Sequence, residues 1–164
     1  MIGRAFAFVM IFAGLQFGWQ ALEGSAVQHL AVDRGIVNPA AILARLITPG
    51  LNVYATGNQL REPAGGLNIV NGCDGMETLF LLVAGLAVAP LSVRGRIAGI
   101  LSGIPVVYVL NQARILALFY ARHSDMKLFD VLHGVVTPLC MVISITAFYY
   151  NWLRFYSASA APST

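Results

Sequence analysis

Three residues of this sequence could perform nucleophilic chemistry together: Cys73, Arg114 and His133. A cysteine becomes a nucleophile as its thiolate, and a nearby cation such as arginine lowers the pKa of the thiol. A histidine can exchange the proton, and an arginine can stabilise an oxyanion on the substrate. These residue types therefore indicate acyl transfer through a cysteine thioester, provided that the fold brings them together.

Cys73 lies in the polar stretch NGCDG, which occupies residues 71–75 directly before a long apolar run. The flanking glycines, Gly72 and Gly75, would let backbone N–H groups and a substrate chain approach the thiol closely. The start of the helix predicted after this stretch carries a partial positive charge, which favours a thiolate. Together with Arg114, these features predict a reactive thiol of low pKa at Cys73.

Two polar residues accompany Arg114 and His133. Asn111 lies one helical turn before Arg114 and on the same helix face, so that the pair forms a polar stripe on an apolar helix. An arginine inside a membrane helix costs about 2.5–3.5 kcal/mol to insert, and it usually faces the bundle interior or a wet cavity. Asp130 precedes His133 by three residues. It could fix the tautomer of the ring, but capping of a helix start is the expected role.

The composition requires that apolar helices position these residues. The chain is 58% hydrophobic and 10% charged, with a mean hydropathy of +0.74, whereas soluble domains are about 25% charged. A membrane-spanning helix needs roughly 20 mostly apolar residues. We therefore predict an all-α integral membrane protein with about four transmembrane helices, over about residues 5–22, 76–93, 97–120 and 131–153.

The segment between the first two spans, residues 23–75, is the only sizeable part predicted outside the membrane. Residues 25–47 mix charge with apolar residues at helical spacing, which predicts an amphipathic helix on the membrane interface, broken near Asn38 and Pro39. Short alternating runs between turn signals predict a small β-hairpin element over residues 51–72. We treat residues 1–164 as a single membrane domain.

The charged residues predict the orientation of the chain. The basic residues of the short loops and ends, Arg4, Arg94, Arg96 and Arg154, fall on one side, which the positive-inside rule assigns to the cytoplasm. All seven acidic residues then fall on the outer side: Glu23, Asp33, Glu62, Asp74, Glu77, Asp125 and Asp130. We therefore expect a multi-pass protein whose larger extramembrane segment is extracytoplasmic.

On this topology Cys73, Arg114 and His133 share one depth. Cys73 directly precedes the second span, and His133 lies in the first turn of the fourth. Arg114 lies six residues before Tyr120 at the outer end of the third span, which is about 9 Å at the helical rise per residue. The three side chains are therefore expected in one layer just below the outer surface. Cys140, in the middle of the fourth span, is expected to be a buried and inert residue.

Other classes of function find less support. A formal net charge of +3 without a basic stripe argues against nucleic acid as a partner. The two cysteines form no CxxC pair, and no residue pattern predicts a metal or another cofactor. A transporter would need polar groups across the whole membrane, whereas these lie near one surface. A non-catalytic membrane scaffold or assembly factor, in which Arg114 pairs structurally with an acidic residue, remains an alternative to an enzyme.

The stretches around these residues resemble the exosortase/archaeosortase family of membrane-embedded cysteine transpeptidases. The resemblance rests on NGCDGMET around Cys73, GIPVVYVLNQARILALFY around Arg114 and FDVLHG around His133. It covers about residues 65–140, and the compact chain is similar to short types such as exosortase H. The family often has Ser or Asn after the cysteine, whereas this sequence has Asp74, whose charge opposes thiolate formation.

The resemblance implies an enzyme with a defined class of substrate. Exosortases recognise a C-terminal sorting signal on an exported protein, made of a short motif, one transmembrane helix and a basic cluster. They are thought to cleave near the motif and to pass the acyl group to a cell-surface acceptor. The resemblance implies Cys73 as the nucleophile, Arg114 as the electrophilic stabiliser and His133 as the proton-transfer residue. It also implies a bacterial cytoplasmic (inner) membrane protein, surrounded by membrane lipid, whose active site faces the extracytoplasmic side.

Overall fold

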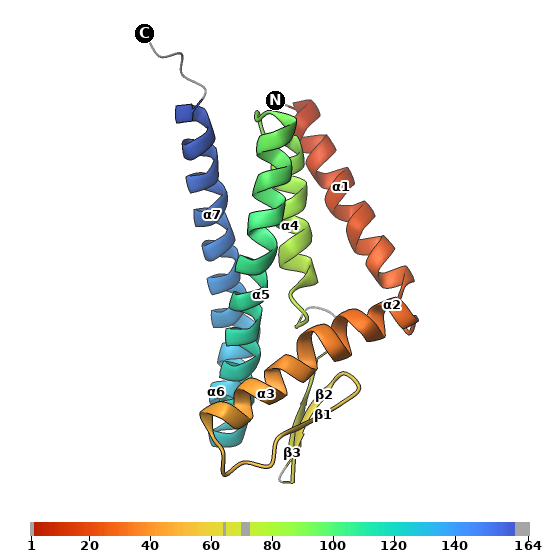
Figure 1. Cartoon of the computed structure of the whole chain (residues 1–164), viewed down its shortest axis with the longest axis vertical. Coiled ribbons are helices and arrows are strands. Elements are labelled where there is room, and N and C mark those ends of the chain that lie inside the picture. The colour runs from red at the N-terminus through yellow and green to blue at the C-terminus, as the bar shows by residue number, and fades with distance from the viewer. Residues whose placement is uncertain (1, 64, 70–72, 160–164) are drawn as a thin grey trace.

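The computed structural model describes residues 2–63, 65–69 and 73–159, with the backbone alone for residues 157–159. Its membrane part is a bundle of α1 (Ile2–Ala21), α4 (Met76–Val88), α5 (Val93–Ser124) and α7 (Thr137–Ser159). The start of α1 and the end of α7 lie at one end of this bundle, here called the proximal end. A small β-sheet lies at the opposite, distal end (Figure 1).

The predicted fold class, an all-α membrane protein with a small β element, is confirmed. α1, α5 and the helical stretch Met126–Tyr156 are each long and apolar enough to cross a membrane. That stretch comprises α6 (Met126–Val131), the π-helix η2 (Leu132–Val136) and most of α7. The remaining apolar helix, α4, is shorter.

α4 is shorter than the predicted second span, 76–93. It has 13 residues, which is about 20 Å at the helical rise, whereas the hydrocarbon core of a membrane is about 30 Å thick. The helix ends at Val88 because Ala89 precedes Pro90, and proline pushes the preceding residue from helical into extended backbone. Ala89 accordingly has φ −60° and ψ 147°. α4 is therefore a partial span, packed against α1, α5 and α7.

α5 extends the third predicted span at both ends. Ser92 caps its start, because the Ser92 Oγ accepts a hydrogen bond from the Gly95 N–H at 3.2 Å. Asp125 ends α5 with extended backbone and begins α6, where its Oδ1 accepts a hydrogen bond from the Lys127 N–H at 2.9 Å. α5 thus runs from the proximal end through the whole bundle into the distal part.

The predicted amphipathic helix forms, but it does not break at Asn38 and Pro39. α2 (Ala26–His29), η1 (Leu30–Val37) and α3 (Asn38–Ile47) follow one another with helical backbone at both junctions. η1 is a π-helix, and the Asn38 N–H donates to the Asp33 carbonyl five residues back. This wider turn accommodates Pro39, which lacks an N–H and would clash with a carbonyl four residues before it in an α-helix. The combined helix crosses the distal half of the bundle diagonally (Figure 1).

The predicted β element is a three-stranded antiparallel sheet rather than a single hairpin. β1 (Tyr54–Thr56), β2 (Gln59–Glu62) and β3 (Gly65–Asn68) pair in chain order. Leu60 and Leu67 are partners across β2 and β3, and both are buried. They belong to a distal hydrophobic core that also contains Ile115 of α5 and Cys73.

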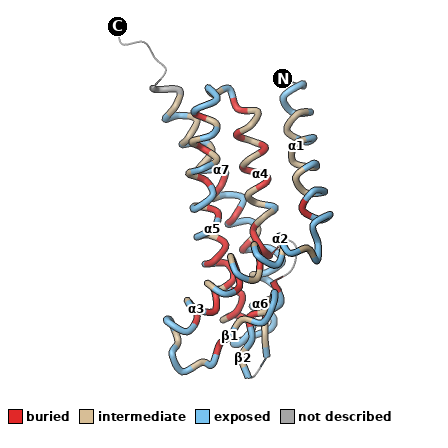
Figure 2. The backbone as a smooth tube through the Cα atoms, turned by 45° about the vertical axis from the view of Figure 1, so that its right-hand side comes forward, coloured by how far each residue is buried: buried red, intermediate tan, exposed pale blue. Residues whose placement is uncertain are grey.

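A second, proximal core lies between α4, α5 and α7 and contains Leu82, Leu86, Val107, Met141 and Ile145. Figure 2 shows buried residues along α4 and α5, whereas α1 is mostly exposed. Trp19, near the distal end of α1, is the only buried residue of that helix. The helices of the proximal core therefore pack closely around shared apolar side chains, and α1 packs on the outside of this group against α4.

Candidate active site

Cys73 lies in a tight loop at the distal end of α4. Gly75 in this loop has a left-handed backbone with φ +80°, which favours glycine. A Cβ at this position would also lie only 2.7 Å from Asn111 Cγ. Asn111 Nδ2 donates a hydrogen bond to the Asp74 carbonyl at 3.0 Å and so fastens the loop to α5. Gly75 and Asn111, both predicted to support the site, thus shape the loop, while Gly72 lies outside the described residues.

Asp74, the residue after Cys73 in this loop, has a buried side chain held by two hydrogen bonds. It is 4% exposed. Its Oδ1 accepts a hydrogen bond from the Met76 N–H at 3.1 Å and satisfies a free N–H at the start of α4. Its Oδ2 accepts a hydrogen bond from Trp19 Nε1 at 3.0 Å. Trp19 was not among the site residues predicted from the sequence, since a tryptophan near the end of a membrane span is ordinarily an interfacial anchor.

The structure brings Cys73, Arg114 and His133 together. Cys73 Sγ lies 3.6 Å from His133 Nδ1, and Arg114 Nη2 lies 4.0 Å from the same sulfur. The three residues come from the loop before α4, from α5 and from η2. Cys73 and Arg114 are buried, at 6% and 8% exposed, whereas His133 is exposed. The thiol therefore lies between a buried cation and a histidine at the surface of the bundle.

A threonine that the sequence analysis did not consider holds Arg114 in place. Arg114 Nε donates a hydrogen bond to Thr137 Oγ1 at 3.1 Å, and that hydroxyl donates to the Leu132 carbonyl at 2.9 Å. Thr137 stands between the end of η2 and Pro138. A proline inside a helical run can be accommodated by a π-turn, and π-turns are frequent at functional sites. The pair Thr137–Pro138, one turn after His133, was therefore the signal in the sequence that could have indicated Thr137.

Phe129, and not Asp130, orients the His133 ring. The two aromatic rings stack, with centroids 5.4 Å apart and an interplanar angle of 5°. Among the described residues no hydrogen bond or ion pair joins Asp130 to His133. Asp130 does not cap the helix either, because the helix begins at Met126 with Asp125 as its N-cap. Both roles predicted for Asp130 are therefore wrong, since the fourth span starts earlier than its apolar pattern indicated.

Burial raises the pKa of the Cys73 thiol above its ordinary value, which contradicts the low pKa predicted from the sequence. The Arg114 guanidinium lowers this pKa, but by less than the loss of hydration raises it. The Asp74 carboxylate raises it further. The resting site therefore holds a neutral thiol, whose proton must pass to a base before the sulfur can attack.

Cys140 is also placed differently from the prediction. Its side chain is exposed on α7, because Met141 and Ile145 form the buried face of that helix. The expected burial of Cys140 is therefore wrong, and the residue lies in the first turn of α7. Burial within the protein cannot account for an inert Cys140, so its inertness stays a prediction.

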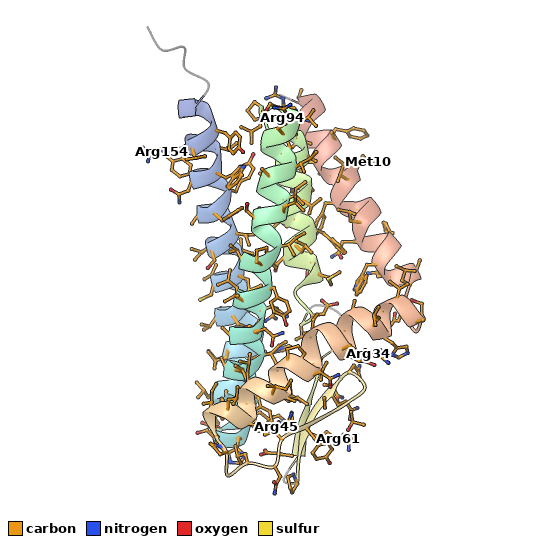
Figure 3. All side chains as sticks on the ribbon, in the orientation of Figure 1. Met10, Arg34, Arg45, Arg61, Arg94 and Arg154 are labelled. Carbon is orange, nitrogen blue, oxygen red and sulfur yellow. The ribbon has the colours of Figure 1, made fainter. Side chains whose placement is uncertain are left out.

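The site lies about one membrane thickness from the proximal end of the bundle. α5 begins at Val93, and Arg114 follows about 32 Å later at the helical rise, while the hydrocarbon core is about 30 Å thick. Figure 3 shows labelled arginines at both ends of the molecule: Arg94 and Arg154 at the proximal end, and Arg34, Arg45 and Arg61 at the distal end. The site thus sits at the distal boundary of the apolar part.

A groove leads away from the site along α4, between α1 and α7. It consists of a cavity of about 200 Å³ that Arg114 and Pro138 help to line, and a more apolar cavity of about 320 Å³ against Gly85. Leu81 lines both cavities, so they lie next to each other along α4. Within residues 2–63, 65–69 and 73–159, no group of three or more His, Cys, Asp and Glu side chains could hold a metal ion.

A comparison with models of protein families matches residues 3–150 to the transmembrane exosortase family. The matched range begins in α1, ends in α7 and contains Cys73, Arg114 and His133. Comparisons with curated proteins and with solved structures give no match.

Proposed function

This chain belongs to the transmembrane exosortase family, and from this we propose that it is a membrane-embedded cysteine transpeptidase. Its substrates would be exported proteins with a C-terminal sorting signal of motif, transmembrane helix and basic cluster. It would cleave the signal through a thioester on Cys73 and transfer the acyl group to a cell-surface acceptor. The observation that carries the proposal is the 3.6 Å contact of Cys73 Sγ with His133 Nδ1, beside the buried Arg114.

The reaction begins from a neutral thiol. His133, with its own proton on Nε2, takes the thiol proton through Nδ1, and the Cys73 sulfur attacks the scissile carbonyl. Arg114, 4.0 Å from the sulfur, stabilises the oxyanion that forms. When the C–N bond breaks, the leaving amine takes the proton from His133, and the acyl group stays on Cys73 as a thioester.

The acceptor resolves this thioester in the second half of the reaction. Its hydroxyl or amine group loses a proton to His133 as it attacks the thioester carbonyl. The Cys73 sulfur then leaves as a thiolate and regains the proton from His133. The same steps with water as the acceptor amount to hydrolysis, so one site serves both outcomes.

We place the transmembrane helix of the substrate in the groove along α4. The groove begins with the cavity at Arg114, and the neighbouring cavity at Gly85 extends it toward the proximal end, between helices long and apolar enough to cross a membrane. At Gly85 a Cβ would meet only the Tyr149 ring, at 3.6 Å. A small residue in such open space lets a second helix approach closely. A helix in this groove would bring the chain at its distal end to Cys73.

We also propose that the protein lies in a bacterial cytoplasmic membrane with its active site on the extracytoplasmic side. The arginines of the proximal end, including Arg94 and Arg154 (Figure 3), support this orientation through the positive-inside rule. The depth of Arg114 along α5 supports a site at the outer boundary of the hydrocarbon. An exported substrate held by its transmembrane helix would present its cleavage motif at this level.

The decisive experiment is cleavage of a sorting-signal substrate in cells that produce Cys73→Ala. We expect cleavage to stop while the protein stays inserted, because the change removes only a sulfur atom and its proton. Cys140→Ala, which removes the other thiol from an exposed position on α7, is the matched control and should cleave normally. Normal cleavage by Cys73→Ala would contradict the thiol mechanism and favour a non-catalytic membrane scaffold.

A further inference from the structure

A hydrogen bond joins the outlying helix α1 to the residue beside the nucleophile. Trp19 Nε1 donates to Asp74 Oδ2 at 3.0 Å. The two side chains are 8% and 4% exposed, so water cannot readily replace this bond. Hydrogen bonds to an ionised group are roughly twice as strong as those between neutral groups. Trp19 is also the only buried residue of α1, and its hydrogen bond is a buried link between α1 and the loop of Cys73.

Donors from three different helices hold Asp74. Trp19 of α1 binds Oδ2, the Met76 N–H of α4 binds Oδ1, and Asn111 of α5 binds the backbone carbonyl. Both carboxylate oxygens therefore already accept N–H groups. A carboxylate occupied in this way competes poorly for the proton of the adjacent thiol, and His133 is left as the acceptor.

We propose that Trp19 is a positioning residue for the reaction: by holding the Asp74 carboxylate, it fixes the loop so that the Cys73 thiol faces His133. The inference rests on the proposed function, because it takes Cys73 as the nucleophile. Trp19 acts through Asp74 and does not touch the reacting atoms. Without the indole N–H of Trp19, the loop would keep its hydrogen bonds from Met76 and Asn111. It would lose the hydrogen bond that comes from α1.

The hydrogen bond itself can be observed by NMR on the full chain in detergent micelles with ¹⁵N-labelled tryptophan. The sequence has two tryptophans, and Trp152 donates its indole N–H to the Gly95 carbonyl, also at 3.0 Å. Burial raises the pKa of Asp74 above the ordinary value. We expect the Trp19 indole signal to move as Asp74 titrates above that value, and the Trp152 signal to stay fixed.

The Asp74→Asn variant separates this titration from that of its neighbours. The charged or titratable groups near Asp74 are Arg114 and the Cys73 thiol, and Asp74 also lines a cavity of about 220 Å³ together with Glu23, His29 and Asp33. The pH-dependent movement of the Trp19 signal should disappear in Asp74→Asn. A movement that persists there would arise from one of the other groups and would overturn the proposal.

The effect on the site is tested with Trp19→Phe in a Cys140→Ala background. Phenylalanine keeps an aromatic ring against Phe80, whose ring centroid lies 6.4 Å from that of Trp19 in an edge-on arrangement, and it removes the N–H donor. We expect iodoacetamide to alkylate Cys73 several-fold faster, because the released loop exposes the thiol. We expect kcat for cleavage to fall about tenfold with KM unchanged, as for loss of a hydrogen bond to a charged group.

Trp152→Phe removes an indole hydrogen bond of the same length at the far end of the bundle and should change neither rate. Faster alkylation with slower cleavage is the signature of lost positioning, and any other combination for Trp19→Phe overturns the inference. If the wild-type protein does not cleave the substrate, the proposed function fails. The NMR and alkylation measurements would then still decide whether Trp19 holds the loop.

Discussion

At the scale of single residues, the site is built around a buried and protonated thiol. Cys73 Sγ has a cation at 4.0 Å and an imidazole nitrogen at 3.6 Å. In water such neighbours would favour a thiolate, but a residue that is 6% exposed loses most of its hydration. A thiol kept neutral until a substrate carbonyl arrives is protected from oxidation and from alkylation at rest, since the thiolate is the reactive form.

The pH dependence of this thiol follows from the direction of its pKa. Because burial raises the pKa of Cys73 above 9.0, the protonated form prevails below that pH. In Cys140→Ala, the rate of alkylation by iodoacetamide should therefore rise with pH and reach half of its plateau above pH 9. Arg114→Gln should move this midpoint higher, because it removes a charge that lowers the pKa, and Asp74→Asn should move it lower. A wild-type midpoint in the neutral range would contradict this account.

The two acid–base candidates beside η2 differ in their expected effect on turnover. His133→Ala removes the only side chain at hydrogen-bond distance from Cys73 Sγ that can accept its proton, among those that the structure describes. Single-turnover cleavage should slow by a factor of about 10²–10⁴, the usual contribution of general acid–base catalysis. Asp130→Asn changes a described residue with no hydrogen bond or ion pair to the His133 ring and should cleave at nearly the normal rate. Equal losses in the two variants would argue against His133 as the base.

At the scale of elements, prolines decide how the site is framed. Pro90 ends α4 early, while the wide turns of η1 and η2 carry the chain past Pro39 and Pro138 without a break. η2 carries His133 and is followed directly by Thr137. The proposed proton acceptor, His133, and the residue that holds Arg114, Thr137, therefore lie one turn apart. The loop of Cys73 is fixed against this frame by α5, through Asn111.

Gly75 is the point at which this loop tolerates no side chain. An L-residue in the left-handed region costs about 1–2 kcal/mol, and a Cβ here would meet Asn111 Cγ at 2.7 Å. Gly75→Ala should lower the midpoint temperature of thermal unfolding, followed by circular dichroism in micelles. The shift should be at least the one that a loss of about 1–2 kcal/mol in unfolding free energy produces. Gly14→Ala is the matched control, because a Cβ there meets nothing within 4 Å. Equal midpoints for the two variants would show that the loop is not held as described.

At the scale of the whole molecule, the arrangement of charge around an apolar bundle predicts its orientation. Exposed single cysteines in a Cys73→Ala, Cys140→Ala background can report it. Asn58→Cys, in the turn between β1 and β2, should react with a membrane-impermeant maleimide in intact cells. Arg154→Cys, at the proximal end of α7, should react only after the membrane is permeabilised. The reverse pattern would place the site on the cytoplasmic side and exclude an exported substrate.

The common depth of Cys73, Arg114 and His133 could be predicted from the sequence because it depends on few quantities. Apolar runs of membrane length indicate helices, and the rise per residue places each side chain along its helix axis. This reasoning correctly indicated the fold class and the amphipathic helix. It failed at two helix boundaries, which hydropathy does not set. α4 ends where Ala89 precedes a proline, and α6 begins after the N-cap Asp125.

Rotation about each helix axis and burial were decided by the tertiary structure alone. Depth along an axis does not say which way a side chain points, so the contacts of Trp19 with Asp74 and of Thr137 with Arg114 could not be foreseen, and Cys140 was expected inside the bundle. The pKa of Cys73 likewise depends on how much water the packed helices and sheet exclude, which no neighbouring residue in the sequence specifies. The residues of the site could therefore be named from the sequence, whereas the protonation of its thiol depends on packing.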